Sequence, residues 1–189
     1  MKVRSSFAKR GLVTLLLSAF VLSMPLMSSA QNDNSIHYQK GYRPNVEVSW
    51  ANNGQFSINS TQAYCFGNGL AAGLGVGFAA DFLGNDFNNE YVEEPTYLIP
   101  LFVNVNYSFL DGTKVSPKIG ARVGEMFDVT NSGLIFTASP YVGIDFSRFT
   151  FAVGYGFQKA VAKLSDYAPL NYLDKDGLHK IRVSFGFTF

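Results

Sequence analysis

The chain has 189 residues and a formal net charge of +1, and its length predicts a single domain. Without the four basic residues of the first thirty, 11 Lys plus Arg remain against 14 Asp plus Glu. This net charge of −3 excludes the basic surface of a nucleic-acid-binding protein. Cys65 is the only cysteine and excludes an intrachain disulfide. We expect neither cofactor nor metal, because no His, Cys or carboxylate set has ligand spacing.

The first thirty residues have the pattern of a secretory signal peptide: basic residues, then an apolar run, then small residues. These are Lys2, Arg4, Lys9 and Arg10, then 11–22, then Ser28-Ser29-Ala30. The apolar run of about a dozen residues is shorter than the roughly 20 that a membrane-spanning helix needs. We therefore expect 1–30 to be cleaved, 31–40 to be a short N-terminal periplasmic segment, and 41–189 to be one domain.

Period-two alternation of apolar with small or polar residues dominates the chain after residue 40. This pattern predicts strands with two unlike faces, and no stretch there has a convincing helical period. The predicted strands are 41–50, 55–66, 70–82, 96–109, 115–129, 134–146, 149–158 and 178–189. We therefore expect an all-β fold with eight strands.

The connections between these strands alternate in length. Short turns follow the second, fourth and sixth strands, at 67–69, 110–114 and 147–148, and long polar loops follow the third and seventh, at 83–95 and 163–177. Outer-membrane barrels have short periplasmic turns, longer extracellular loops and both termini in the periplasm, and this order fits. The connections after the first and fifth strands are short for extracellular loops.

Side-chain volume decides which face of the predicted sheet points outward, because alternation alone fits a soluble, ligand-binding barrel equally well. An eight-stranded barrel has an interior just wide enough for side chains, so eleven phenylalanines cannot all point into it. We therefore predict an eight-stranded antiparallel up-and-down transmembrane β-barrel with phenylalanine facing lipid. The inward glycines are Gly73, Gly75, Gly77, Gly120, Gly124, Gly143, Gly154, Gly156 and Gly186, and the outward residues are Phe78, Phe82, Phe109, Phe136, Phe146, Phe149, Phe151, Phe157, Phe185, Phe187 and Phe189.

Some positions depart from this pattern or refine it. Leu98, Phe102 and Tyr141 fall on the inward parity, and Pro140 lies within a strand of a closed barrel. Because proline lacks the N–H of a ladder bond, we expect a local bulge or a shifted register there. Aromatic residues near strand ends suit two interfacial girdles; they include Tyr42, Trp50, Tyr97, Tyr107 and Phe189.

Charged residues fall on the inward parity of several strands. Unpaired charges in so narrow a space cost several kcal/mol, so we expect a salt-bridged plug in the barrel interior. The alternative prediction is a narrow gated channel. The inward charges are Arg43, Glu47, Asp81, Lys118, Arg122, Asp145, Lys180 and Arg182.

Four short motifs occur in the order Gly41-Tyr42-Arg43, Gly73-Leu74-Gly75-Val76-Gly77-Phe78, Ile99-Pro100-Leu101-Phe102 with Tyr107-Ser108-Phe109, and Phe185-Gly186-Phe187-Thr188-Phe189. Together they resemble the small bacterial outer-membrane β-barrel family, similar to the OmpA transmembrane domain and OmpX. The resemblance implies a location in the cell outer membrane, among lipid and lipopolysaccharide. It also implies an assembly signal read by the β-barrel assembly machinery, with periplasmic chaperones on the way; the matching positions are Ile181, Val183, Phe185, Phe187 and Phe189. Membership of this family implies no activity.

We expect a monomeric structural or surface-interaction protein whose loops, 83–95 and 163–177, present a contact surface to an unknown surface ligand. The loop side chains that such a ligand would meet include Glu90, Tyr91, Glu93, Glu94, Tyr167 and Tyr172.

A membrane-embedded lipid-modifying enzyme, of the lipid A deacylase or acyltransferase type, is the alternative from another class. Such chemistry needs a histidine near a nucleophilic hydroxyl. His37 precedes the barrel, and His179 has no serine two positions further along its own face. We therefore expect no enzyme, although Glu125 and Asp128 stay open as catalytic carboxylates.

Overall fold

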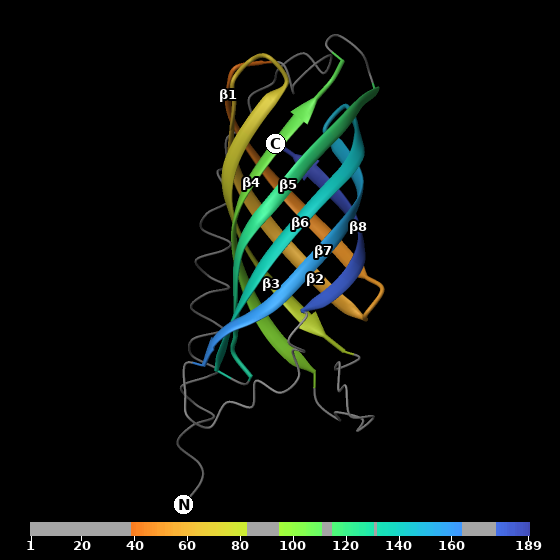
Figure 1. Ribbon diagram of the computed structural model, residues 1–189. Coiled ribbons are helices and arrows are strands. Elements are labelled where there is room, and N and C mark those ends of the chain that lie inside the picture. The colour runs from red at the N-terminus through yellow and green to blue at the C-terminus, as the bar shows by residue number, and fades with distance from the viewer. Residues whose placement is uncertain (1–38, 83–94, 111–114, 131, 164–176) are drawn as a thin grey trace, which may run out of the picture.

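The computed structural model describes residues 39–82, 95–110, 115–130, 132–163 and 177–189. In this part of the chain, eight strands form a closed barrel in which each strand pairs with its sequence neighbours and β8 pairs with β1 (Figure 1). Every pairing is antiparallel. The expected eight-stranded up-and-down β-barrel is thus confirmed. The strands are β1 (Gly41–Ala51), β2 (Gln55–Cys65), β3 (Leu70–Asp81), β4 (Thr96–Ser108), β5 (Val115–Asp128), β6 (Gly133–Phe146), β7 (Phe149–Lys163) and β8 (Leu178–Thr188).

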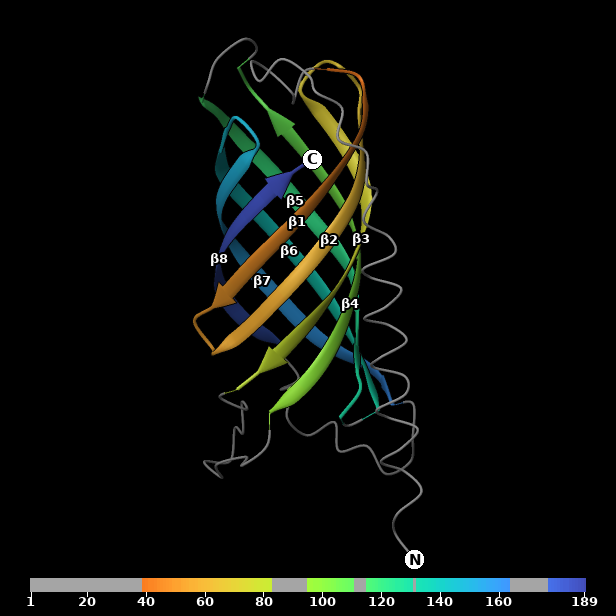
Figure 2. The same cartoon turned by 180° about the vertical axis from the view of Figure 1, so that it is seen from behind.

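The barrel has two unlike ends. At the terminal end, β1 begins, β8 ends, and short turns join β2 to β3 and β6 to β7 (Figures 1 and 2). At the loop end, the hairpin 52–54 joins β1 to β2, β3 and β7 end, and β4 and β8 begin. In the turn after β2, Gly67 and Gly69 adopt φ values of +87° and +86°, a conformation that favours glycine.

Strand bounds agree with the predicted ones to within one residue, except at β7. This strand continues five residues beyond the predicted end at Gln158. Its pairing with β6 changes register there, because Leu134 faces Ala162 whereas Ile135 faces Ala160. Val161 is therefore the extra residue of a β-bulge, which interrupts the alternation that sequence reading relies on.

The prediction of a bulge or shifted register near Pro140 is wrong. β6 keeps one register with β7 on both sides of the proline, since Ala138 faces Phe157 and Tyr141 faces Gly154. The ladder is simply interrupted at Ser139 and Pro140. A missing N–H removes a ladder bond, and this interruption requires no inserted residue.

Several predicted features lie outside the described residues. They are the signal peptide 1–30, most of the segment 31–40, His37, and the loop side chains of 83–94 and 164–176. Within the part of the chain that is described, no helix is long and apolar enough to cross a membrane.

Candidate functional site: the polar interior and its cavities

The two faces of the barrel differ as predicted in side-chain type. Large apolar and aromatic side chains of all eight strands point outward and are exposed, among them Leu101, Val142 and Phe185. The inward positions carry small or polar side chains, and the buried set is dominated by serine, threonine, asparagine, charged residues and alanine. The barrel is therefore apolar outside and polar inside.

Two inward aromatic rings occupy space that glycines leave. A Cβ atom on Gly75 would lie 2.3 Å from the ring of Phe102, and one on Gly120 would lie 2.3 Å from Cζ of Tyr141. The inward positions of Phe102 and Tyr141 thus follow from glycines on the neighbouring strands.

At the terminal end, Lys118 and Asp145 form a buried ion pair with 2.7 Å between Nζ and Oδ1. The Ser108 hydroxyl donates to Oδ2 of Asp145 at 2.8 Å, and the Thr150 hydroxyl donates to Oδ1 at 2.6 Å. The predicted set of inward charges includes Lys118 and Asp145, but the prediction missed both hydroxyls. Ser108 of β4 and Thr150 of β7 both fall on the inward parity of their strands, and this sequence pattern would have identified them. Bonds of this kind satisfy the carboxylate that burial would otherwise penalise.

Near mid-height, Arg122 of β5 reaches across the barrel to Glu47 of β1. Its guanidinium donates to both carboxylate oxygens, with 2.5 Å between Nη1 and Oε1, the bidentate arrangement that a planar guanidinium favours. The guanidinium also lies over the ring of Tyr141, 4.9 Å from its centroid. The Tyr141 hydroxyl donates to Oδ1 of Asn104 at 3.0 Å. This assembly crosses the lumen.

Toward the loop end, the charges differ from the predicted pattern of ion pairs. Lys180, which is 1% exposed, donates from Nζ to the side-chain carbonyl of Gln55. Asp81 accepts a hydrogen bond from Nδ2 of Asn53 at 3.1 Å. Arg182 forms no ion pair or side-chain hydrogen bond within the described chain. An uncharged amide thus takes the place that sequence reasoning assigned to a carboxylate.

The remaining predicted charge, Arg43, donates to Oε1 of Gln39 at 3.0 Å. A further inward charge was missed in the predicted network: Asp128, at the loop end of β5, is 2% exposed. Its parity with Lys118 and Arg122 on the same strand would have placed it inside.

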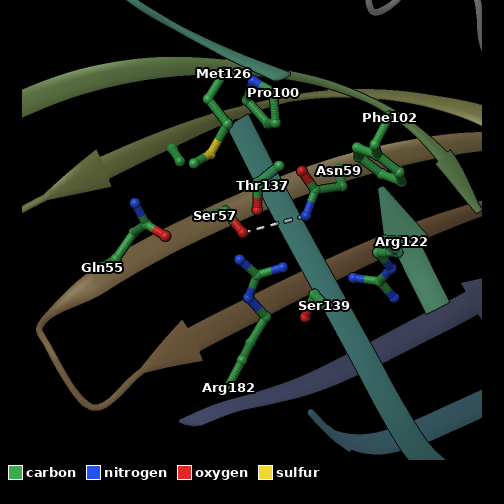
Figure 3. A pocket seen from close by; sticks show the side chains of 11 residues that line it. Gln55, Ser57, Asn59, Pro100, Phe102, Arg122, Met126, Thr137, Ser139 and Arg182 are labelled. Atoms are coloured by element: carbon green, nitrogen blue, oxygen red, sulfur yellow. Dashed lines mark hydrogen bonds between the residues drawn. The ribbon is translucent and has the colours of Figure 1, made fainter. Parts of the chain in front are cut away.

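Two small cavities lie in this polar interior, and Arg122 lines both. One, of about 20 Å³, lies toward the loop end and is bordered by Gln55, Ser57, Ser139 and Arg182 (Figure 3). The other, of about 50 Å³, lies toward the terminal end and is bordered by Arg43, Glu47 and Lys118. A cavity needs about 10–15 Å³ to hold one water molecule, so these spaces accommodate a few waters or small ions.

The candidate catalytic residues do not gather into one site. His179 points outward, with its Nδ1 atom 2.5 Å from the Tyr155 hydroxyl and its ring 5.3 Å from that of Phe157. Glu125 is exposed on the outer face, whereas Asp128 is buried inside. Among the described residues, no three His, Cys, Asp or Glu side chains form a group that could hold a metal ion.

Comparison of the sequence with known protein families and with characterised proteins finds no match. Solved structures with a similar course of chain include the N-terminal β-barrel domain of Pseudomonas aeruginosa OprF, at 12% identity and a TM-score of 0.47 over 80% of this chain and 98% of that chain. Neisserial surface protein A is 14% identical, with a TM-score of 0.48 over 78% and 92% of the two chains. The outer membrane enzyme PagL is 12% identical, with a TM-score of 0.47 over 77% and 98%. The fold of this chain rests on its own strand pairing, which makes it a closed eight-stranded antiparallel β-barrel.

Proposed function

We propose that this protein is an integral outer-membrane β-barrel with a structural or surface-interaction role, whose interior is closed and whose loop end is extracellular. One observation carries the proposal: large apolar side chains cover the outside of the barrel, while charges and hydroxyls fill the inside. A water-soluble barrel would have the opposite arrangement.

The outer surface supports insertion into a bilayer. Soluble monomers rarely expose a contiguous apolar patch larger than a few hundred Å², whereas exposed apolar side chains here lie on every strand. A closed barrel pairs its backbone groups between strands and leaves no open edge, as hydrocarbon surroundings demand. Tyr42, Trp50, Tyr97 and Tyr107 are exposed near strand ends, where aromatic girdles contact the lipid headgroups.

The interior favours a structural role over conduction. Arg122 lines both cavities, of about 20 and 50 Å³, and its pair with Glu47 spans the lumen; both observations support an interior that passes no solute unless that pair rearranges. Because the lumen is closed, we infer that function depends on the outer surface and on the segments 83–94, between β3 and β4, and 164–176, between β7 and β8.

The assembly partners follow from the same proposal. Outward alternate residues of β8 end at Phe189, whose backbone N–H donates to the carbonyl of Pro44 at 2.9 Å. We infer that Ile181, Val183, Phe185, Phe187 and Phe189 are read by the β-barrel assembly machinery, after delivery by periplasmic chaperones. Lower recovery of a Phe189→Ala variant with the assembly complex is the expected result, and unchanged recovery contradicts it.

A pair of substitutions tests bilayer insertion. Leu101 and Leu110 are almost equally exposed, at 51% and 47%, but Leu101 lies at the middle of β4 and Leu110 lies in the turn after it. Because Glu125 faces Leu101 across β4 and β5, both variants are made in a Glu125→Gln background. There, Leu101→Lys should lower the free energy of unfolding in lipid vesicles by about 2–4 kcal/mol, the cost of a lysine near the bilayer midplane. Leu110→Lys should change it by less than about 0.5 kcal/mol, as exposed substitutions do.

The measurement is denaturant unfolding in vesicles, followed by the mobility difference between unboiled and boiled samples on a detergent gel. Equal, small effects of both substitutions, or recovery of the protein in the soluble fraction, would overturn the proposal.

A further inference from the structure

The cavity toward the loop end contains a cation that the protein leaves without a counter-charge. Figure 3 shows the guanidinium of Arg182 directed into the space near Ser57 and Ser139. Within the described chain, Arg182 has neither an ion pair nor a hydrogen bond from its side chain. Arg182 is half-buried, and withdrawing a cation from bulk water without a partner costs free energy, so this position calls for an anion or for water.

The acidic group that acts on Arg182 is already engaged. Glu47 attracts Arg182, whereas Arg122 and Lys180 repel it, and the acid Asp81 acts on Lys180. Both carboxylate oxygens of Glu47 accept hydrogen bonds from Arg122, so the pair is neutral as a unit. Lys180, the next inward residue of β8, adds a second cation, whose ammonium group donates to the side-chain carbonyl of Gln55.

The lining of the cavity is rich in hydrogen-bond donors. Nε2 of Gln55 and Nε of Arg122 are buried without a partner. Thr137 and Ser139 add hydroxyl groups that make no side-chain hydrogen bond within the described chain. One acceptor, Oδ1 of Asn59, is also buried without a partner. Two buried N–H donors without a partner thus stand against one such acceptor. The Thr137 and Ser139 hydroxyls can donate or accept, and the excess of N–H donors favours an anion.

We propose that this cavity is a binding site for a small monatomic anion of the chloride class, held by the guanidinium of Arg182 with the Gln55 amide and the Ser139 hydroxyl beside it. A volume of about 20 Å³ is close to the space that one water-sized occupant needs, which favours a monatomic anion over the larger phosphate or sulfate. The site goes beyond the proposed function, which needs only a closed interior. Its occupant pairs with the guanidinium of Arg182.

Linkage gives the first test, because an anion that binds only the folded barrel stabilises it. Above the dissociation constant, each tenfold rise in chloride should raise the folded-to-unfolded ratio about tenfold for one site. The full chain is folded in detergent, and unfolding is followed by gel mobility at constant ionic strength, with gluconate replacing chloride. Arg182→Met should abolish this dependence.

Lys159→Met is the matched control. It removes the same charge and keeps a similar side-chain length, but Lys159 is exposed on the outer face of β7. This variant should keep the chloride dependence of the unaltered protein. Equal chloride dependence of the unaltered protein and Arg182→Met would show a general salt effect and overturn the proposal.

A second measurement uses the unaltered protein, so a variant that fails to fold leaves the proposal testable. Crystals grown in bromide at a concentration well above the dissociation constant found from the stability measurement should show anomalous density beside Arg182. Water alone in the cavity, or bromide elsewhere only, would overturn the site. Neither result would affect the lipid-facing test at Leu101, so failure of the anion site and failure of membrane insertion are distinguishable.

Discussion

Gly75 and Gly120 decide what the middle of the lumen contains, because each leaves room for an aromatic ring from a neighbouring strand. The rings of Phe102 and Tyr141 both lie against the guanidinium of Arg122, with centroids 5.7 Å and 4.9 Å away. The position of the Arg122–Glu47 pair thus depends on two residues that carry no side chain.

Gly120→Ala is expected to destabilise the barrel. The new methyl group would lie 2.3 Å from Cζ of Tyr141, and overpacking of this kind costs about 1–3 kcal/mol. Gly186→Ala is the control, because its Cβ would meet the flexible end of Asn45 at 3.1 Å. Denaturant unfolding in vesicles should show a clearly larger loss for Gly120→Ala, and equal losses would refute the steric argument.

Strand β7 accommodates one extra residue in a β-bulge. Lys159 and Val161 are both exposed, whereas Gln158 is buried. After the change of register at Val161, β7 stays paired to β6, with its inward and outward positions shifted by one residue. The bulge confines the disturbance to the loop end, outside the ion-paired middle.

Deletion of Val161 is expected to be tolerated, since it converts the bulge into regular pairing without moving any other side chain to the opposite face. Deletion of Val153, another exposed valine of the same strand but in regular register with β6 and β8, should prevent folding. A one-residue slip exchanges the two faces of a strand. The heat-dependent mobility shift should survive the first deletion and vanish with the second; the reverse result would contradict the assigned bulge.

For the whole molecule, the unlike ends of the barrel set its orientation in the membrane. The terminal end has short turns and both ends of the described chain, and the loop end carries the segments 83–94 and 164–176. In outer-membrane barrels short turns face the periplasm. The proposed orientation follows from this asymmetry.

Two asparagines provide a matched test of orientation. Asn52 at the loop end and Asn68 at the terminal end are both exposed, and each accepts a backbone hydrogen bond at 3.1 Å, from Ile181 and Leu70 respectively. In a Cys65→Ser background, Asn52→Cys should react with a membrane-impermeant maleimide on intact cells. Asn68→Cys should react only after the outer membrane is opened, and the opposite pattern would invert the proposed topology.

Much of this architecture is readable from the amino-acid sequence because it depends on local patterns. Alternation at period two identifies the strands and their faces, and the contrast between glycine and phenylalanine sets which face is inside. The same parity places Glu47, Lys118, Arg122 and Asp145 in the lumen. At β7 the outward position after Phe157 is Lys159, and this charge breaks the apolar alternation two residues before the bulge, which is why the end of β7 was misplaced.

Which interior groups meet is decided only by the closed barrel. Glu47 and Arg122 are 75 residues apart, and Lys180 and Gln55 are 125 residues apart. Contacts at such separations depend on the combined stagger of all eight strands around the closed sheet. No local sequence pattern gives that combined stagger. By itself the sequence determined the number of strands and their inward and outward faces. Only the tertiary structure decided that Arg122 pairs with Glu47, that Lys180 donates to an amide, and that Arg182 faces a cavity. The physical reason is that strand stagger sets which side chains lie at the same height in the lumen.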